Sequence, residues 1–299
     1  MIYTVTLNPA IDYVMHTGEL CPGGITRSEY EEYFIGGKGI NVSVMLKTLG
    51  ADSTALGFVA GFTGRLICDY LKEIGIKEDF IRLLSGFTRI NVKLKSSLES
   101  EINGAGPTVS HDDTKNISEK LVGALNDDWI VISGSAPKNS PDDIFEQTVC
   151  AASHTQAKTV IDCSGDKLIP LLKYRPFLIK PNHHELSQAV GEDVTDHRSA
   201  AAAAEKLRSL GAQNVLVSMA GDGAVLVCDE GVFSVKAPKG ELKNSVGAGD
   251  SMVAGFIAGY IGTGDFKDAL KLACASGSAT AFSPGLAEKS LIDRLVKEL

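Results

Sequence analysis

The stretch KTVIDCSGDKLIPLLKYRPFLIKPNHHELSQAVGEDVTDHRSAAAAAEKLRSLGAQNVLVSM, residues 158–219, decides the fold class. It contains three short apolar runs, KTVIDCS (158–164), FLIKPN (177–182) and NVLVSM (214–219), and helical patterns over 183–190 and 196–210. Continuously apolar strands that alternate with helices are typical of a parallel sheet that helices cover on both faces. The stretch therefore predicts part of a three-layer α/β/α core.

The same alternation extends through most of the chain. Further strands are expected at 2–7, 53–59 and 129–133, and further helices at 38–49, 63–74, 113–125 and 141–153. In the last quarter, AVLVCD (224–229) and GVFSVKA (231–237) flank the turn residues Asp229 and Glu230 and predict an antiparallel pair. Three helices are expected after it, at about 248–262, 265–282 and 288–298. The main sheet is therefore expected to be mostly parallel.

Two segments do not follow this alternation of strands and helices. Residues 12–35 and residues 88–102 alternate polar and apolar side chains, as strands with one solvated face do. We interpret them as one small sheet, built from two separate insertions, that projects from the core.

Composition and charge exclude several classes of protein. With 29 basic and 37 acidic residues the chain carries a formal charge of −8, which argues against a surface that grips nucleic acid. None of the six cysteines has the spacing of a zinc ligand pair, so most are expected to be core thiols in a reducing compartment. No signal peptide is visible before IYTVTL, and the apolar run 252–262 is shorter than the ~20 residues that cross a bilayer. We therefore expect a cytoplasmic protein with no membrane partner.

The sharpest local signal is NSVGAGDSMVAGF, residues 244–256. Gly247, Ala248 and Gly249 allow backbone N–H groups to converge where a helix begins, and a helix N-terminus attracts anions. A carboxylate at Asp250 beside a bound phosphate makes chemical sense if it accepts a proton from an attacking hydroxyl. The alternative is that Asp250 only caps the helix.

A second glycine-rich segment, FIGGKGINVSVMLKTLG, covers residues 34–50. It is not a Walker A loop, because no Ser or Thr follows Lys38 and the glycine spacing differs. Either this backbone presents Lys38 and Asn41 to a ligand, or it is an ordinary glycine-rich turn with a solvated lysine.

A third cluster, KPNHHEL at 180–186, follows a predicted strand at the edge where open α/β sheets place their ligands. Asn182 and Glu185 suit magnesium held through water. His183 and His184 diverge on a helix and have no third ligand at a suitable spacing, so we interpret them as surface or supporting residues. Asp12, Arg89 and SGSAP at 133–137 are weak signals when taken separately.

Ten segments occur in a fixed order along nearly the whole chain: TLNPAID, GGKGINVS, TRINVK, EINGAGP, SGSAP, DCSG, KPNHHEL, VSMAGDGA, VGAGDS and SGSATAFSPG. Together they resemble the PfkB branch of the ribokinase-like carbohydrate kinases. The segments NPAIDY, GGKGIN and EINGAGP are most similar to the 1-phosphofructokinase and tagatose-6-phosphate kinase subgroup. The resemblance implies a ribokinase-like core at 1–11, 36–87 and 103–299 and a small β-sheet lid at 12–35 and 88–102.

The resemblance also implies a reaction, the ATP-dependent phosphorylation of fructose 1-phosphate to fructose 1,6-bisphosphate. Asp250 would be the general base, and the amides of Gly247, Ala248 and Gly249 would form the anion hole. The substrate-binding residues would be Asp12, Gly37, Lys38, Gly39, Asn41, Arg89 and Ser135. Among these, Lys38 and Arg89 would meet the phosphate that the sugar already carries.

For the nucleotide, the resemblance implies ATP with Mg²⁺, the metal lying near Asn182 and Glu185 through water. The ATP-binding residues would be Lys180, Asn182, Ser218, Gly221, Gly223, Ser245, Ser276 and Gly277. One position departs from the family pattern, because Ala220 stands where Ser-x-Gly-x-x-Gly has its first glycine. If that backbone needs a positive φ, the loop must shift, and the positions of Ser218 and Gly223 with it.

Three alternatives stay open at the level of sequence. Tagatose 6-phosphate is a close alternative substrate, and an unphosphorylated sugar or nucleoside is a further one. A non-catalytic sensor of sugar phosphates is a third, although a sensor has no need for Asp250. A homodimer formed through the lid is the expected assembly.

Overall fold

Ten strands form the main sheet of the computed structural model, which describes residues 1–163 and 167–299. In spatial order the sheet contains β14 (Gly231–Val235), β13 (Ala224–Cys228), β12 (Asn214–Ser218), β11 (Leu178–Ile179), β10 (Lys158–Asp162), β9 (Trp129–Ser133), β1 (Ile2–Thr6), β4 (Thr54–Ala60) and β5 (Lys77–Glu78), and β6 (Ile81–Leu83) also pairs with β4. The strands from β12 to β6 are parallel, whereas β13 runs antiparallel to both of its neighbours, β12 and β14. The mostly parallel sheet is thus confirmed.

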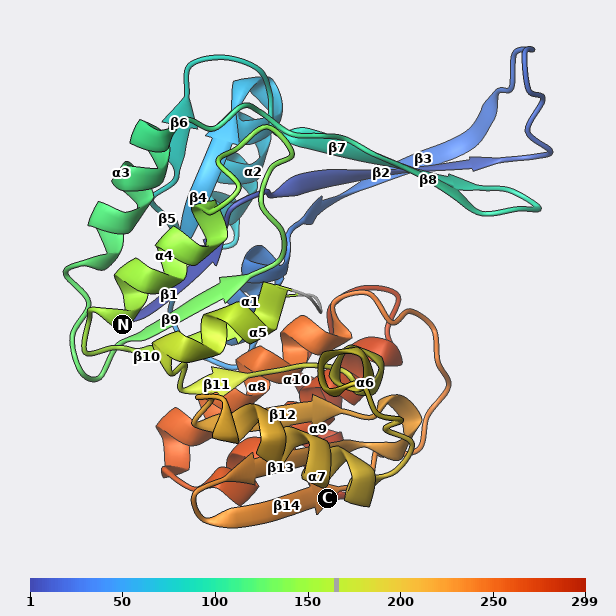
Figure 1. Cartoon of the computed structure of the whole chain (residues 1–299). Helices are drawn as coiled ribbons and strands as arrows, with labels where there is room; N and C mark the ends of the chain where they lie inside the picture. Colours follow the sequence, from blue (N-terminus) through green and yellow to red (C-terminus); the bar gives the residue numbers. More distant parts are fainter. Residues whose placement is uncertain (164–166) are drawn as a thin grey trace.

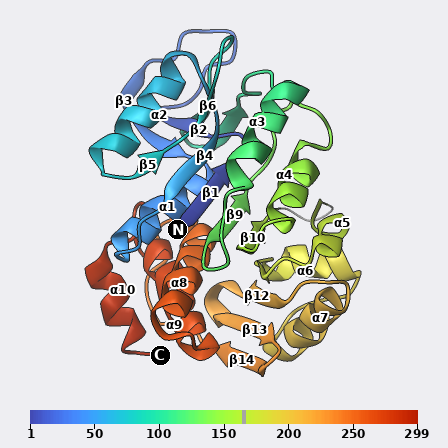
Figure 2. The same cartoon turned by 90° about the vertical axis from the view of Figure 1, so that its left-hand side faces the viewer.

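Helices cover both faces of this sheet (Figure 1, Figure 2). One face packs against α3 (His111–Leu121), α4 (Ile144–Ser153), α5 (Leu168–Leu171), α6 (His183–Val190) and α7 (His197–Ser209). The other packs against α1 (Lys38–Thr48), α8 (Ala248–Thr263), α9 (Phe266–Ala281) and α10 (Lys289–Val296). A third cluster joins α2 (Gly61–Glu73) to β4 and the base of the lid. Successive strand residues such as Ile130 and Val131 enter opposite layers, which explains why the strands are apolar throughout.

A separate four-stranded sheet projects as a long arm from the core (Figure 1). It orders β3 (Ser28–Gly36), β2 (Ala10–Thr17), β7 (Arg89–Lys95) and β8 (Ser100–Asn103), and thus joins two distant parts of the chain. Asp12 on β2 pairs with Asn91 on β7, and both side chains lie on one face of this sheet. The next residue, Tyr13, pairs with Tyr33 and Val92, and these side chains lie on the other face. This sheet is the expected lid, although the limits 12–35 and 88–102 stay a prediction because no observation tests them.

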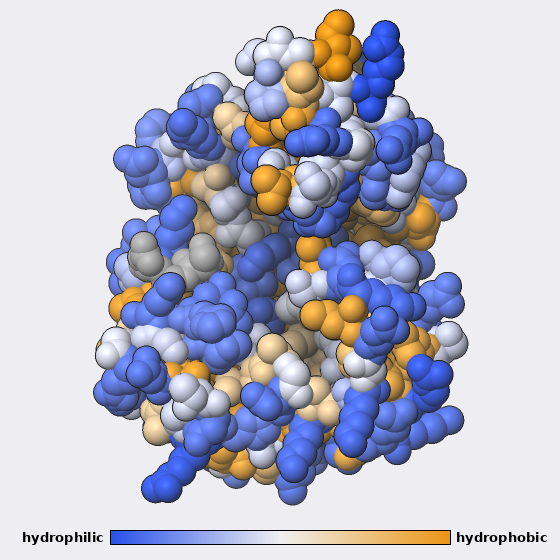
Figure 3. Space-filling model, turned by 90° about the vertical axis from the view of Figure 1, so that its right-hand side faces the viewer, coloured by the Kyte–Doolittle hydropathy of each residue, from blue (hydrophilic) through white to orange (hydrophobic). Residues whose placement is uncertain are grey.

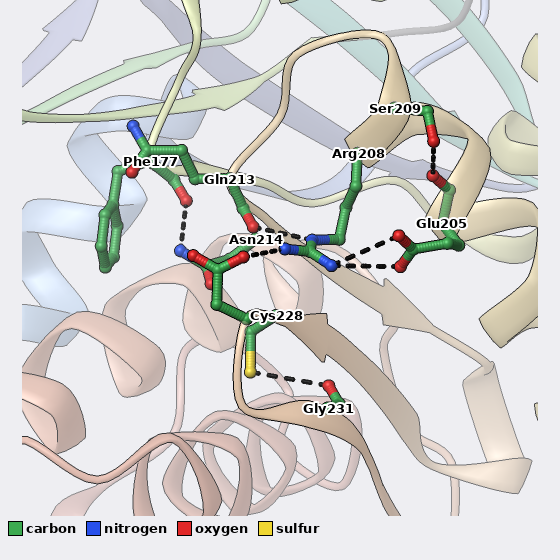
Figure 4. Close-up of polar contacts among 9 residues, drawn as sticks. Phe177, Glu205, Arg208, Ser209, Gln213, Asn214, Cys228 and Gly231 are labelled. Atoms are coloured by element: carbon green, nitrogen blue, oxygen red, sulfur yellow. Dashed lines mark hydrogen bonds and ion pairs between the residues drawn. The ribbon is translucent and has the colours of Figure 1, made fainter.

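Polar contacts fasten α7 to the sheet at the end away from the lid (Figure 4). The Arg208 guanidinium donates to the carbonyl of Gln213 at 2.9 Å and pairs with Glu205 and Asp229. Nearby, Asn214 Nδ2 donates to the carbonyl of Phe177 at 2.7 Å. These bonds attach the end of α7 and the start of β11 to the start of β12.

The expected elements agree closely with the structure, and the differences are short segments. The patterns did not predict β5, β6, α5 or two short 3₁₀ turns at Leu172–Tyr174 and Ala220–Asp222. The run 177–182 forms only two strand residues, because Pro181 has no N–H for the ladder. All six cysteines are free thiols. Ser164 and Gly165 of the DCSG motif lie outside the described residues. No helix in the described ranges has the length and apolar character needed to span a membrane.

Candidate active site

The first turn of α8 presents unpaired backbone donors at the edge of the main sheet. Gly247 caps the helix at φ +80°, and a Cβ there would lie 2.7 Å from Leu286. Within the described residues the N–H groups of Gly247, Gly249 and Asp250 donate no hydrogen bond, while that of Ala248 reaches the carbonyl of Ser245 at 3.3 Å. The helix therefore offers free N–H groups, but the amide of Ala248 is directed towards Ser245.

Asp250 is a buried carboxyl group, 5% exposed, in that same turn. Its Oδ2 accepts a hydrogen bond from Asn41 Nδ2 at 2.8 Å. Burial and the negative charge of Asp162 raise the pKa of Asp250 to about 6, against the opposing effects of Asn41, Lys38 and Lys180. The group therefore remains ionised at neutral pH, yet it binds a proton more strongly than an ordinary carboxylate does.

Two lysines converge on Asp162, at the carboxyl end of β10. Lys38 Nζ lies 3.3 Å from Asp162 Oδ2 and Lys180 Nζ lies 3.4 Å from Oδ1. Burial alone would raise the pKa of Asp162, but the two ammonium groups hold it below its ordinary value. Likewise burial alone would lower the pKa of Lys38, but Asp162, Asp250 and Glu185 raise it. The result is a cluster of alternating charges beside α8, in which Asp162 and Lys180 are buried and Lys38 is partly exposed.

Lys180 brings positive charge directly to the first turn of α8. Its Nζ lies 3.0 Å from the position that a Cβ would take at Gly249. A side chain at Gly249 would therefore displace the ammonium group. Close approach also explains glycine at the start of α1, where a Cβ on Gly37 or Gly39 would come within 2.8 or 2.4 Å of Thr6. These glycines let α1 carry Lys38 and Asn41 up to the end of β1.

The residues expected near magnesium form the N-terminal cap of α6. Asn182 Oδ1 accepts from the N–H of Glu185 and Glu185 Oε2 accepts from the N–H of Asn182, each at 2.8 Å. One carboxylate oxygen of Glu185 stays available. No three His, Cys, Asp or Glu side chains in residues 1–163 and 167–299 are grouped to hold a metal. These residues fit a hydrated magnesium ion shared with phosphate oxygens, and not an ion held by the protein alone.

The expected nucleotide residues lie in four segments: the start of α6, the turn after β12, the loop before α8, and α9. Ser218 ends β12 and forms a bridge with Asn182, which places the turn at 218–223 beside the α6 cap. Gly223 adopts φ +101°, and a Cβ there would lie 2.0 Å from the carbonyl of Val235. Ala220 adopts φ +49°, so the alanine accepts the left-handed conformation and the turn is kept.

The remaining nucleotide residues differ in their position. Gly221 lies in the 3₁₀ turn and Ser245 in the loop before α8. Gly277 on α9 approaches Met252 and the carbonyl of Ala248, next to the first turn of α8. The hydroxyl of Ser276, in contrast, lies in the α8–α9 interface, where a Cβ on Gly255 would be 2.7 Å from it.

The lid supplies a second polar group. Asp12 Oδ1 accepts from Asn91 Nδ2 at 2.8 Å, and Asp12 Oδ2 lies 3.4 Å from Lys93 Nζ. Arg89 Nε donates to the carbonyl of Asn8 at 3.2 Å; burial lowers the pKa of Arg89, and the charge of Asp12 opposes that shift. Asp12 and the guanidinium of Arg89 therefore lie together at the base of the lid.

Several buried polar atoms around the site have no hydrogen-bond partner among residues 1–163 and 167–299. They are Thr6 Oγ1, Asn8 Oδ1, Asn91 Oδ1, Ser133 Oγ, Asp162 Oδ1, His183 Nδ1 and Ser276 Oγ. Most of them lie at the carboxyl ends of β1, β9 and β10 or on the lid. Figure 3 shows a hollow with largely hydrophilic walls on the face from which the arm projects. Buried polar groups without partners are rare in folded proteins, so their concentration indicates a place for a polar ligand.

The structure groups the expected residues in a way that the sequence did not predict. Lys38 is surrounded by Asp162, Asp250 and Glu185, whereas Arg89 faces Asp12, so the two cations expected at one phosphate lie in different charge environments. Ser135 lies in the exposed loop after β9. Asp162 and Lys93 were not among the expected site residues, although DCSG and TRINVK contain them.

The chain is similar to known carbohydrate kinases along almost its whole length. Residues 5–293 match the model of the pfkB family carbohydrate kinases. The chain is 46% identical over its whole length to a 1-phosphofructokinase of Bacillus subtilis, covering 98% of that protein. It is 36% identical, again over 100% of the chain and 98% of the relative, to a D-tagatose-1-phosphate kinase of Bacillus licheniformis.

Solved structures agree with this result. The crystal structure of phosphofructokinase-2 from Escherichia coli in complex with substrates and products superposes with a TM-score of 0.91, at 27% identity, and the match covers 100% of this chain and 99% of that one. The expected ribokinase-like core and small β-sheet lid are thereby confirmed. Because residues 5–293 match the family model and the whole chain is 46% identical to a 1-phosphofructokinase, this chain belongs to the pfkB family of carbohydrate kinases and is an ATP-dependent sugar-phosphate kinase.

Proposed function

We propose that this kinase transfers the γ-phosphoryl group of ATP to the free primary hydroxyl of fructose 1-phosphate, giving fructose 1,6-bisphosphate. One observation carries the proposal: the buried Asp250 carboxyl lies in the first turn of α8, beside N–H groups that have no partner among the described residues, and near the buried Lys180 and the partly exposed Lys38. A proton acceptor and an anion-binding helix end are therefore at the same place, as in-line phosphoryl transfer requires.

Asp250 acts as the general base in this proposal. Its carboxylate takes the proton of the attacking hydroxyl while the new oxygen–phosphorus bond forms and the bond to ADP breaks. A pKa of about 6 suits a base that works near neutral pH. The hydrogen bond from Asn41 leaves lone pairs on both oxygens of Asp250 for that proton.

The positive charges stabilise the phosphoryl group during transfer. The free N–H groups of Gly247 and Gly249 form the anion hole, and Lys180 and Lys38 add charge beside it. The amide of Ala248 joins them when it leaves the long bond to Ser245. The nucleotide is proposed to lie along Asn182, Ser218, Gly221, Gly223, Ser245, Ser276 and Gly277. Magnesium, held through water near Glu185, would neutralise charge on the phosphates of ATP.

The sugar is proposed to bind between the lid and the end of β1. Asp12, Gly37, Gly39 and Asn41 would meet its hydroxyls, and Arg89 with Ser135 its resident phosphate. The Bacillus subtilis relative is named for fructose 1-phosphate, and the Bacillus licheniformis relative for tagatose 1-phosphate. The second candidate is therefore tagatose 1-phosphate, which keeps the phosphate on carbon 1, ahead of tagatose 6-phosphate.

A substrate panel tests the proposal. ADP release would be measured with ATP and magnesium on fructose 1-phosphate, tagatose 1-phosphate, tagatose 6-phosphate, fructose 6-phosphate and ribose. We expect the highest kcat/KM on fructose 1-phosphate, and an equal or higher value on another sugar would refute the choice. D250N should bind fructose 1-phosphate with unchanged affinity in calorimetry while losing turnover. An active D250N enzyme would remove Asp250 as the base.

We also propose that two copies associate through their lids. The row Tyr33–Tyr13–Val92–Ile102 crosses all four lid strands in register on the face opposite Asp12, and Tyr33 and Ile102 are 53% and 64% exposed. Apolar side chains gathered on one face of a thin sheet favour burial against a partner. Light scattering should show a dimer that I102E converts to a monomer, whereas E101Q on the opposite face leaves it intact. A monomeric unaltered protein would end this proposal.

The six free cysteines support a reducing, cytoplasmic location.

A further inference from the structure

Lys93 is a lid residue that the reaction described above does not use. It lies on β7, on the same face as Arg89 and Asn91, and its side chain is 20% exposed. Its Nζ lies 3.4 Å from Asp12 Oδ2 and 3.9 Å from Glu101 Oε1. Neither contact has the geometry of a hydrogen bond, so the ammonium attracts both carboxylates while its three N–H donors remain available.

The contacts of Asp12 show what this attraction achieves. Asn91 donates to one carboxylate oxygen, and Lys93 lies beside the other. On β3, Phe34 pairs with Asp12, and a Cβ on Gly36 would lie 3.1 Å from Asp12 Oδ2, so glycine at position 36 places no side chain against this oxygen. Each oxygen keeps a lone pair, and the plane of the carboxylate is fixed from two sides. A fixed carboxylate of this kind can accept two neighbouring sugar hydroxyls only in one relative configuration.

We propose that Lys93 is a positioning residue for the sugar: it holds the carboxylate of Asp12 in the orientation that accepts adjacent hydroxyls of the ketohexose phosphate, and so contributes to the choice between epimers. The inference rests on the proposed function. Fructose and tagatose differ in configuration at carbon 4, so a carboxylate held in one plane suits one of them better. Lys93 acts through Asp12 and has no part in the transfer itself.

The chain contains a matched control on the same strand. Lys95 is the next residue outward on this face of β7, and its Nζ pairs with Glu99 at 2.6 Å. It carries the same charge and lies in the same sheet, but no contact joins it to Asp12. K95M therefore removes a lid lysine without releasing the carboxylate.

Steady-state kinetics on K93M, K93Q, K93R and K95M test the inference. For K93M and K93Q we expect the KM for fructose 1-phosphate to rise about fivefold, the size expected for loss of a partly buried ion pair. The kcat, the KM for ATP and the unfolding midpoint should stay within error, and the preference in kcat/KM for fructose 1-phosphate over tagatose 1-phosphate should fall. K93R should restore the KM to within about twofold, since it keeps the charge. K95M should match the unaltered enzyme.

A double-mutant cycle separates action through Asp12 from direct contact with the sugar. If Lys93 works by positioning Asp12, K93M should add no further loss in a D12N background. An additive loss, an unchanged KM in both K93M and K93Q, or an equal change in K95M would overturn the inference. Absence of activity on fructose 1-phosphate in the unaltered enzyme would instead overturn the proposed function, so the two failures are distinguishable.

Discussion

Replacing Asp250 by Asn should stabilise the ligand-free protein at neutral pH while it abolishes catalysis. The pKa of Asp250 is about 6 in the folded protein, against an ordinary value of 3.8. A carboxyl group whose pKa rises on folding opposes folding when it is ionised, because the unfolded chain gives up the proton more readily. Asp250 is 5% exposed, so solvent does not screen this cost appreciably.

The size of the effect follows from that difference in pKa. About two pKa units correspond to ~3 kcal/mol, since one unit equals about 1.4 kcal/mol. The cost is complete above pH about 6 and disappears as the pH falls towards 3.8, where both states are protonated. An asparagine keeps the hydrogen bond with Asn41 but carries no charge. We therefore expect D250N to unfold with a free energy ~1–3 kcal/mol higher at pH 8, and with nearly the same free energy at pH 4.

Equilibrium denaturation by urea, without sugar or nucleotide, measures this difference at several pH values. The matched control is D265N, because Asp265 caps α9 through the N–H groups of Lys267 and Asp268, and these bonds lower its pKa. The pKa of Asp265 is lowered on folding, whereas that of Asp250 is raised, so the ionised Asp265 stabilises the folded protein. D265N should therefore destabilise the protein at pH 8 and lose its effect as the pH falls. If D250N is no more stable at pH 8, or if its gain does not shrink towards pH 4, the electrostatic account of the site is wrong.

Two further predictions concern the nucleotide loop and the buried charge cluster. A220G should raise the unfolding free energy by up to ~1 kcal/mol, because it relieves a left-handed alanine, and should leave the KM for ATP within about twofold. G223A should lower the unfolding free energy by more than ~2 kcal/mol and raise the KM for ATP, because its Cβ would meet the carbonyl of Val235. A lower stability for A220G in urea denaturation would contradict the assigned strain. D162N removes a negative charge that raises the pKa of Asp250, so the acid limb of the pH profile of kcat/KM should move to lower pH. Profiles measured from pH 5 to 8 test this, and an acid limb that stays in place or moves to higher pH would contradict it.

Much of the architecture was predictable because local patterns have local causes. Strands buried between two helical layers must be apolar on both faces, and the runs at 129–133 and 214–219 show this directly. The hairpin around Asp229 and Glu230 follows from two turn residues between apolar runs, and the register Cys228↔Gly231 confirms it. The helix over 248–263 begins where VGAGD predicts, because glycine tolerates the left-handed cap at Gly247.

Some short elements escaped prediction because their residues have no strong preference of their own. The two-residue strand Lys77–Glu78 exists because its backbone pairs with the N-terminal end of β4. Ala220 was doubtful in the sequence because alanine disfavours a positive φ, yet surrounding hydrogen bonds hold it there, including that from the N–H of Gly223 to its carbonyl at 3.2 Å. Tertiary context overrides local preference at such positions.

The sequence by itself determined the layered α/β core, the paired insertions and the motifs that identify the family, because periodicity and glycine placement act over a few residues. Only the tertiary structure decided which charges meet. Lys38 and Asp162 are 124 residues apart, and Asn41 and Asp250 are 209 apart. Their contacts depend on the order of strands in the sheet, and the pKa of Asp250 depends on burial that no local pattern encodes. The different charged neighbours of Lys38 and Arg89, and the contact of Lys93 with Asp12, arise in the same way, since they follow from the placement of α1 in the core and from the pairing of β2 with β7 in the lid.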